Sequence, residues 1–275
     1  MRAQTATAAS ASSSPILLRE DQGGIAVLTL NRPQARNSLS EALLEALGDT
    51  LSAIAHDRAV RAVVLAALGP AFSAGHDLKE LNAHSSEEDR GRVYFKRIMG
   101  LCSHVMQQIV RLPQPVIASV HATATAAGCQ LVASCDLAIA SQAAKFATPG
   151  VNIGLFCSTP MVALSRNVSR KHAMQMLLTG DLISADEAAR IGLVNQVVPA
   201  GQERATAIKL AEKIAAKSTH TVKIGKEAFY RQAEMSLADA YDYTSQVMVE
   251  NMLARDAQEG ISAFIEKRDA KWQDR

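Results

Sequence analysis

Two short segments rich in small residues carry the first chemistry that the sequence suggests. The segments AFSAGHDL (71–78) and ATAAGCQL (124–131) each follow an apolar run and lead toward a helical pattern. Backbone N–H groups are free at the start of a helix, and the helix dipole favours negative charge there. Two such turns facing each other would form an oxyanion hole for an enolate or a tetrahedral thioester intermediate. For either segment alone, a simpler explanation is that small residues permit close packing of a strand on a helix.

Short β-rich runs alternate with helical patterns along the first 200 residues and would position these segments. Apolar runs such as 60–68 are nearly continuous, as expected for a strand that is covered on both faces. Capping boxes are predicted at Ser38 with Glu41 and at Ser184 with Glu187, the second helix ending at Gly192. Strands are expected over 25–31, 60–68, 115–121, 137–141, 145–148 and 193–198, and helices over 40–57, 91–111 and 128–135.

This pattern predicts an α/β protein with three regions. Residues 1–14 are rich in Ala, Ser and Thr and are expected to form a disordered tail. Residues 15–200 are expected to form the α/β core. Residues 201–275 have an almost purely helical pattern.

The composition excludes several classes of function. The chain has 29 basic and 27 acidic residues, so neither a nucleic-acid-binding stripe nor a polybasic membrane patch is indicated. The longest uncharged run, between Arg111 and Asp136, is interrupted by prolines and polar residues and is a poor membrane span. The four cysteines show no C-x-x-C spacing and are expected to be buried free thiols. A cytoplasmic location is predicted, or a mitochondrial one if the N-terminal tail is a transit peptide.

Motifs for nucleotide and zinc chemistry are absent from the sequence. It contains no G-x-x-x-x-G-K-[ST], no G-x-G-x-x-G and no H-E-x-x-H. Nucleotide hydrolysis and zinc-dependent hydrolysis therefore lack a basis in the sequence, and no metal site is predicted.

Several motifs in order make the chain resemble the enoyl-CoA hydratase/isomerase (crotonase) family over roughly residues 16–270. They are LNRPQARNSLS (30–40), AFSAGHDLKEL (71–81), AAGCQLVASCDLAIAS (126–141), KFATPGVNIGL (145–155), LLTGDLISADEAARIGLVNQVV (177–198) and FIEKRDAKW (264–272). The resemblance implies a spiral of ββα units and a helical C-terminal region used for trimerisation. It also implies a homotrimer, or a hexamer made of two trimers, and a coenzyme A thioester as substrate or ligand without a covalently bound cofactor.

The resemblance also assigns site residues by position. It implies that the backbone amides of His76 and Ala127 hold the thioester oxygen. Lys267, with Arg268, is expected near the nucleotide end, and these cations and Arg36 are equally well explained as solvated surface charges. The residues implied in substrate or CoA binding are Arg36, Ala74, Gly75, Asp77, Leu78, Gly128 and Lys267.

The two glutamates that hydratases of this family use to add water are replaced in this chain. By position, one is Gln130 and the other is Gly150. An amide does not titrate usefully and glycine has no side chain, and one acid–base group typically supplies about 10²–10⁴-fold in rate. Efficient hydration is therefore not expected. The combination most resembles a subgroup of the family whose members share both replacements.

Few neighbouring side chains could replace the missing acid–base pair. His76 is the most titratable candidate, with its imidazole pointing either at the acyl pocket or outward. Cys129 would be a nucleophile only with a lowered pKa, and buried packing is the alternative. Cys157 and Ser158 are not acidic. Of the remaining carboxylates, Asp77 is expected to cap a helix and Asp136 to be structural.

Three functions remain open from the sequence. One is an acyl-CoA enzyme, a lyase or isomerase of fatty acid metabolism, that depends on the oxyanion hole for slow thioester hydrolysis, decarboxylation or isomerisation. A second is a non-catalytic acyl-CoA binder. A third is a hydratase with a relocated acid or base. A protein-interaction module without a ligand is a more distant alternative, because it has no need for two amide turns.

Overall fold

Three successive stretches of chain each give one strand to a large sheet and the next strand to a small sheet. In this computed structural model, which describes residues 14–275, each pair of strands is followed by helical turns. The pairs are β3 (Ala62–Ala67) with β4 (Ala71–Ser73), β5 (Val116–Val120) with β6 (Thr123–Thr125), and β7 (Leu137–Ser141) with β8 (Lys145–Ala147). This arrangement confirms the predicted spiral of ββα units. The tail expected over residues 1–14 lies, except for Ser14, outside the described residues.

The large sheet has six strands in the order β1-β2-β3-β5-β7-β10. The hairpin of β1 (Leu17–Gln22) and β2 (Ile25–Leu30) is antiparallel, and the remaining pairs are parallel. The last strand, β10 (Gln196–Val198), is shorter than the expected run 193–198. The small sheet has the order β4-β6-β8-β9, in which only the short β9 (Ile183–Ser184) is antiparallel to its neighbour.

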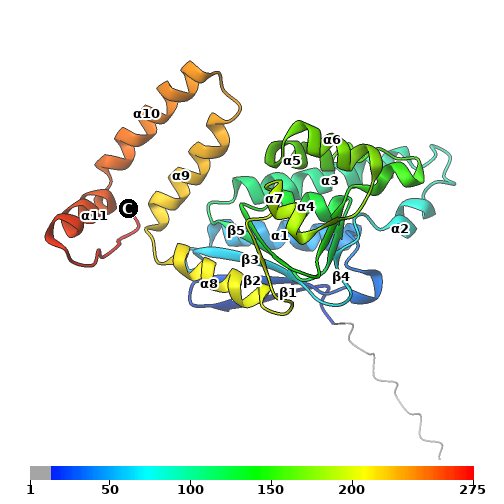
Figure 1. Cartoon of the computed structure of the whole chain (residues 1–275), viewed down its shortest axis with the longest axis horizontal. Coiled ribbons are helices and arrows are strands. Elements are labelled where there is room, and N and C mark those ends of the chain that lie inside the picture. Colours follow the sequence, from blue (N-terminus) through cyan, green and yellow to red (C-terminus); the bar gives the residue numbers. More distant parts are fainter. Residues whose placement is uncertain (1–13) are drawn as a thin grey trace, which may run out of the picture.

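Helices cover both faces of the large sheet, as the near-continuous apolar strands predict (Figure 1). On one face, α1 (Glu41–His56), α3 (Arg92–Arg111) and α4 (Ala127–Ser134) contribute to the main hydrophobic core. On the other face, α8 (Glu203–Ala215) packs Ala207 and Ala211 against the sheet, although it lies in the helical region 201–275. The inner strands of the large sheet therefore have few solvent-facing side chains, and β2 is buried along its whole length, whereas the edge strand β1 exposes four of its six residues.

Three helices project from this core at the left of Figure 1 and end the chain. They are α9 (Thr219–Gln232), α10 (Leu237–Leu253) and α11 (Arg255–Glu266). Within residues 14–275, no helix combines the length and the apolarity that a membrane crossing needs. The other helical segments are η1 (Pro33–Ala35), α2 (Leu78–Ala83), η2 (Pro149–Ile153), α5 (Pro160–Asn167), α6 (Arg170–Thr179) and α7 (Ala185–Arg190).

The N-cap of α1 differs from the prediction. Ser40 is the cap, and its Oγ accepts a hydrogen bond from Leu43 N at 3.2 Å, so the capping box predicted at Ser38 and Glu41 is wrong. Ser38 instead donates its hydroxyl to Asp77 Oδ2 at 3.0 Å. Ser38 and Ser40 are both of a residue type that favours the N-cap position, so the local sequence does not distinguish them. The hydrogen bond of Ser38 to the distant Asp77 leaves Ser40 as the cap.

The cap predicted for α7 is confirmed in the structure. Ser184 Oγ accepts a hydrogen bond from Glu187 N at 3.2 Å. The helix itself ends at Arg190, two residues before the expected stop at Gly192.

Gly128 lets α4 pack directly on β4. A Cβ atom added at Gly128 would lie 2.2 Å from the carbonyl oxygen of Ser73, which is backbone and cannot move aside cheaply. We expect Gly128→Ala to lower the free energy of unfolding by about 1–3 kcal/mol, as overpacking does. Urea denaturation measures this change. The matched control is Gly100→Ala in α3, where an added Cβ meets nothing within 4 Å. Alanine has a higher helix propensity than glycine, so this change should stabilise the protein by up to about 1 kcal/mol.

Candidate active site

Three parallel strands of the small sheet end at the same edge, and each is followed by a segment that the sequence singles out. Ser73 of β4 is in register with Ala124 of β6, and Thr125 of β6 is in register with Ala147 of β8. The loop to His76 follows β4, helix α4 follows β6, and η2 follows β8. The sheet thus brings together residues more than 70 positions apart in the sequence.

The loop after β4 presents a free backbone amide at His76. Leu39 N donates to Gly75 O at 2.7 Å, and Asp77 N donates to Leu39 O at 3.4 Å. These two bonds form a bridge between Leu39 and His76 and hold the loop in place. The amide between them, His76 N–H, has no acceptor among residues 14–275.

The turn after β6 presents a second free amide at Ala127. Ala126 N donates to Ala147 O at 3.0 Å, and the first helical hydrogen bond runs from Gln130 N to Ala126 O at 3.0 Å. Ala127 is the first residue of α4, where an N–H has no partner within the helix. In the described part of the chain it donates to no other group either.

The two loops touch at Gly75. A Cβ atom added there would lie 2.9 Å from Ala126 Cβ and 3.2 Å from Ala127 N, and the φ angle of Gly75 is +92°. Only glycine fits such a position without strain. His76 is the next residue, so the two unused amides lie on adjoining segments of the chain. An oxyanion hole needs two such donors that converge on one oxygen atom.

Ala126 carries backbone strain immediately before the second amide. Its φ and ψ angles are 50° and −121°, a region that residues with a Cβ rarely occupy. We expect Ala126→Gly to stabilise the protein by about 1 kcal/mol, because relief of strain exceeds the entropy that glycine adds to the unfolded chain. Thermal unfolding followed by circular dichroism checks this. An unchanged or lower melting temperature would show that the surrounding structure sets this turn without strain.

Several residues implied in CoA binding lie around the same loops. Ala74 N donates to Arg36 O at 3.0 Å, and both residues are exposed. Leu78 is exposed too and lines an open groove of about 660 Å³. Phe95 and Leu155 line the same groove, which is mainly apolar and suits the body of a ligand.

Asp77 has its carboxylate committed to the protein. It caps α2 by accepting from Lys79 N at 3.1 Å, and it pairs with Arg32 at 3.1 Å. Burial favours a higher pKa for Asp77, but the hydrogen bonds from Ser38 and Arg32 outweigh it and lower the pKa. Asp77 is therefore an ionised helix cap, as expected, and it holds the loop that carries His76.

Lys267 lies apart from the other predicted residues. It follows α11, at the opposite side of the molecule from α2 (Figure 1). Arg268 forms ion pairs with Glu259 and Glu266 of the same helix. A role for Lys267 in CoA binding would therefore need the site of another copy of the chain.

The positions of the two replaced glutamates lie at the ends of β6 and β8. Gln130 lies in the first turn of α4, and its Oε1 is buried without a hydrogen-bond partner among the described residues. The following loop fills the space beside Gly150: an added Cβ atom would lie 2.7 Å from Leu155 O and 2.9 Å from Cys157 Sγ. Gly150 N donates to that sulfur at 3.3 Å. Neither position offers a titratable group.

His76 is half-buried as a residue, and its two ring nitrogens are shielded from solvent. The backbone of Leu39 lies close to the ring. Burial lowers the pKa of His76, so the ring is neutral near pH 7.

The cysteines are all buried free thiols, as predicted. Burial raises the pKa of Cys129 to about 12 and also raises the pKa of Cys157. Neither is a thiolate near neutral pH, so packing rather than nucleophilic chemistry explains Cys129.

Two polar residues of the site were not singled out as site residues from the sequence. Thr148 follows β8, is fully buried, and has no partner for its Oγ1 in the described chain. Asn37 joins the loops: its Nδ2 donates to Leu68 O and Ala71 O at 2.7 and 2.8 Å. The place of Asn37 in the motif LNRPQARNSLS could have indicated that it belongs to the site. Nothing in the sequence pointed to Thr148 except that it precedes Pro149.

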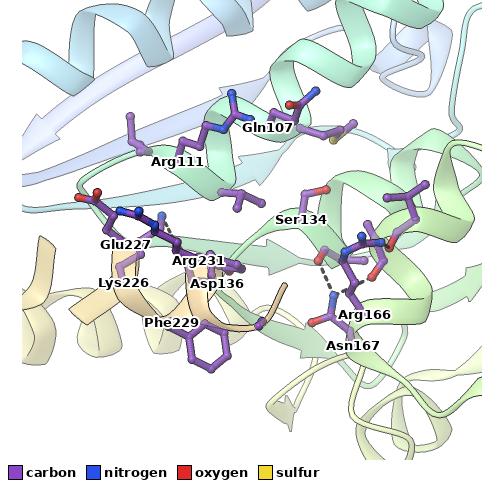
Figure 2. A pocket seen from close by; sticks show the side chains of 18 of the residues that line it. Gln107, Arg111, Ser134, Asp136, Arg166, Asn167, Lys226, Glu227, Phe229 and Arg231 are labelled. Atoms are coloured by element: carbon purple, nitrogen blue, oxygen red, sulfur yellow. Dashed lines mark hydrogen bonds and ion pairs between the residues drawn. The ribbon is translucent and has the colours of Figure 1, made fainter. Parts of the chain in front are cut away.

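A second groove, of about 1170 Å³, separates the core from α9 (Figure 2). Figure 2 shows Arg166 and Asn167 of α5 on one side and Glu227 and Phe229 of α9 on the other. Gln130 also lines this groove. The groove therefore extends from Gln130, one of the two positions of a replaced glutamate, to α9.

Asp136 anchors α9 to the core at this groove, in agreement with its expected structural role. It accepts from Lys226 Nζ at 2.6 Å, from Tyr230 Oη at 2.9 Å and from Val116 N at 2.7 Å. Burial lowers the pKa of Lys226, and Asp136 counteracts this. Lys226 Nζ also donates to the carbonyl oxygens of Ile109 and Gln114.

Comparisons with known proteins agree with the fold. A family model described as enoyl-CoA hydratase/isomerase matches residues 20–275. The chain is 49% identical over 251 residues to the rat protein named enoyl-CoA hydratase domain-containing protein 3, mitochondrial, covering 91% of this chain and 82% of the relative. A crystal structure of an enoyl-CoA hydratase from Mycobacterium smegmatis superposes with a TM-score of 0.90 at 52% identity, covering 94% of this chain and 99% of that one.

The crystal structure of human enoyl-CoA hydratase domain-containing protein 3 superposes with a TM-score of 0.89 at 47% identity, covering 94% of this chain and all of the other. The chain therefore belongs to the enoyl-CoA hydratase/isomerase family and has the crotonase fold. Within the family, it is similar to the proteins named enoyl-CoA hydratase domain-containing protein 3, the subgroup that the two replaced glutamates indicated.

Proposed function

We propose that this protein binds acyl-CoA thioesters and holds the thioester oxygen between the backbone amides of His76 and Ala127. The observation that carries this proposal is the pair of unused N–H groups that Gly75 brings together. The apolar groove beside Leu78 would take the acyl or pantetheine part of the ligand. Arg36, Ala74 and Gly75 belong to the loops that lead to His76 and would contact the CoA moiety.

Hydration by the family's usual acid–base pair is expected to be slow. Neither Gln130 nor Gly150 can serve as a general acid or base, and one such group is worth about 10²–10⁴-fold. The backbone donors remain and can still polarise a thioester, each contributing about 3 kcal/mol to transition-state stabilisation. Reactions that need charge stabilisation more than a strong acid therefore suit this site better: thioester hydrolysis, decarboxylation or isomerisation.

Melting temperature and hydration of crotonyl-CoA, measured together, test this proposal. Butyryl-CoA should raise the melting temperature more than CoA alone, because a ligand that binds only the folded state stabilises it. Wild type should hydrate crotonyl-CoA slowly, and Gln130→Glu, which restores a carboxylate of the same length, should be up to about 10²-fold faster. The absence of any shift at millimolar ligand would contradict binding. Binding with no turnover on a panel of acyl-CoA thioesters would favour the non-catalytic alternative.

The projecting helices would serve self-association. Leu237, Met252 and Phe264 of α10 and α11 are exposed apolar side chains on a surface that a second copy could cover. We propose a homotrimer, or a hexamer of two trimers, in which Lys267 lies near the site of a neighbouring copy. Analytical ultracentrifugation measures the mass directly, and a monomer at micromolar concentration would contradict it.

The compartment stays a prediction with two alternatives. The rat relative is named as mitochondrial, whereas the Mycobacterium smegmatis relative is bacterial. A fluorescent fusion that keeps residues 1–14 distinguishes a mitochondrial from a cytoplasmic location.

A further inference from the structure

The core and the three projecting helices are joined by the short segment 216–218. Helix α8 ends at Ala215 and α9 begins at Thr219. Arg61, which directly precedes β3, reaches this junction from the core: its Nε donates to Ala215 O at 2.7 Å and its Nη2 donates to Lys217 O at 2.8 Å. The core therefore contacts the backbone at the point where the helices leave it.

The chain returns to the same junction after α11. Asp274 accepts from Arg61 Nη1 at 2.9 Å, although 213 positions separate the two residues in the sequence. Asp274 also accepts from the backbone N–H of Thr219, the first residue of α9, at 2.8 Å. One carboxylate thus joins the core to the start of the projecting helices.

Trp272 lies between α11 and the junction. A Cβ atom added at Gly260 of α11 would lie 3.3 Å from the indole ring, so the ring packs on the backbone of that helix. The indole Nε1 donates to Ala216 O at 2.9 Å. The same segment of chain therefore contacts the last helix and the junction together.

A buried carboxylate at the start of α11 fixes this segment from its other side. Asp256 is only 1% exposed and accepts from Gln273 N at 2.7 Å and from Asp274 N at 2.9 Å. It also accepts from the hydroxyl of Ser218 at 2.5 Å, and Ser218 caps α9. Hydrogen bonds to a charged group contribute more to stability than neutral ones, so these contacts hold the segment firmly.

The direction in which α9–α11 project depends on these contacts. Apart from the bonds around Asp136 and the exposed pair of Arg166 with Glu234, a groove of about 1170 Å³ separates α9 from the core. We propose that residues 272–275 are a strap that fixes α9–α11 in the projecting arrangement, and that Arg61 holds this strap to the core. The strap thereby keeps the exposed apolar side chains of α10 and α11 available to a second copy of the chain. This last consequence rests on the self-association proposed above.

Fluorescence of Trp272 tests the strap directly, because this residue is the only tryptophan in the sequence. In Asp274→Ala the emission should shift to longer wavelength, and acrylamide should quench it more strongly than in wild type. The amide of Thr219 loses its acceptor and should exchange with D₂O about 10-fold faster, as expected for the loss of one hydrogen bond. Asp269→Ala is the matched control, since Asp269 is exposed on the same stretch after α11, and it should behave like wild type.

Sedimentation of the same samples measures the consequence for assembly. A wild type larger than a monomer, together with an Asp274→Ala variant that has an exposed Trp272 and a smaller mean mass, supports the proposal. Wild-type quenching and exchange in Asp274→Ala overturn the strap, and an exposed Trp272 with unchanged mass overturns its role in assembly. A monomeric wild type contradicts the self-association itself, and quenching and exchange then decide the strap alone.

Discussion

Ala127→Pro is expected to lose about 10²–10³-fold in any acyl-CoA reaction that this site performs, together with some stability, because proline disfavours the backbone conformation of the preceding residue, Ala126, whose φ angle is 50°. The change removes one backbone N–H, and loss of one oxyanion-hole donor has an effect of this size. Ala127 is the first residue of α4, a position at which proline is well tolerated because the N–H has no helical partner there. The same N–H has no other acceptor in residues 14–275, so folding loses no hydrogen bond.

The rate of crotonyl-CoA hydration measures this effect, with far-UV circular dichroism to verify the fold. Ala127→Gly is the matched control: it keeps the N–H and removes only a buried methyl group. It should retain most of the activity, with a loss of stability of about 1 kcal/mol. A folded Ala127→Pro variant with wild-type rates would show that the amide of Ala127 contacts no developing charge.

Asp136→Ala is expected to lower the free energy of unfolding by about 3–5 kcal/mol, because it leaves the ammonium group of Lys226 buried without its charge partner. The side chains of Lys226 and Asp136 are only 7% and 14% exposed. The change also leaves Tyr230 Oη and Val116 N without their acceptor. Urea denaturation measures the loss, and hydrogen exchange should show faster opening of α9 than of α1.

The matched control breaks the other ion pair beside the same groove. Arg166 and Glu234 are 3.1 Å apart, but their side chains are 57% and 66% exposed. Water and salt screen such a pair, so Glu234→Ala should cost about 0–1 kcal/mol. Equal losses in Asp136→Ala and Glu234→Ala would mean that α9 is not fixed to the core by its buried contacts.

The long, periodic segments of the fold were predictable from the sequence, and the shortest strands were not. The apolar spacing of 40–57 and 91–111 corresponds to α1 and α3 within a residue or so at each end. β4 and β6 are not among the expected strands, because each has three residues and no readable alternation. They are strands only because each pairs with the other and β6 with β8, which no local pattern encodes.

The candidate site was predictable to the extent that it depends on the backbone. The small residues around Gly75 and Gly128 indicated two amide turns, and both turns lie where they were expected. Side-chain environments were not predictable in the same way. Whether the His76 ring faces solvent depends on Leu39 and on packing from segments distant in sequence, and Lys267 is positioned by α11 rather than by its motif.

The closed loop over Gly150 has a consequence for how this chain could evolve or be engineered. Reversion at Gln130 needs only the exchange of an amide for a carboxylate in an existing side chain. Reversion at Gly150 must also displace the carbonyl of Leu155 and the sulfur of Cys157, which occupy the place of a Cβ. A library of single substitutions would therefore reach a well-accommodated glutamate at position 130 and not at position 150. A route back to two glutamates has to begin with remodelling of residues 155–157, which by itself brings no gain in rate.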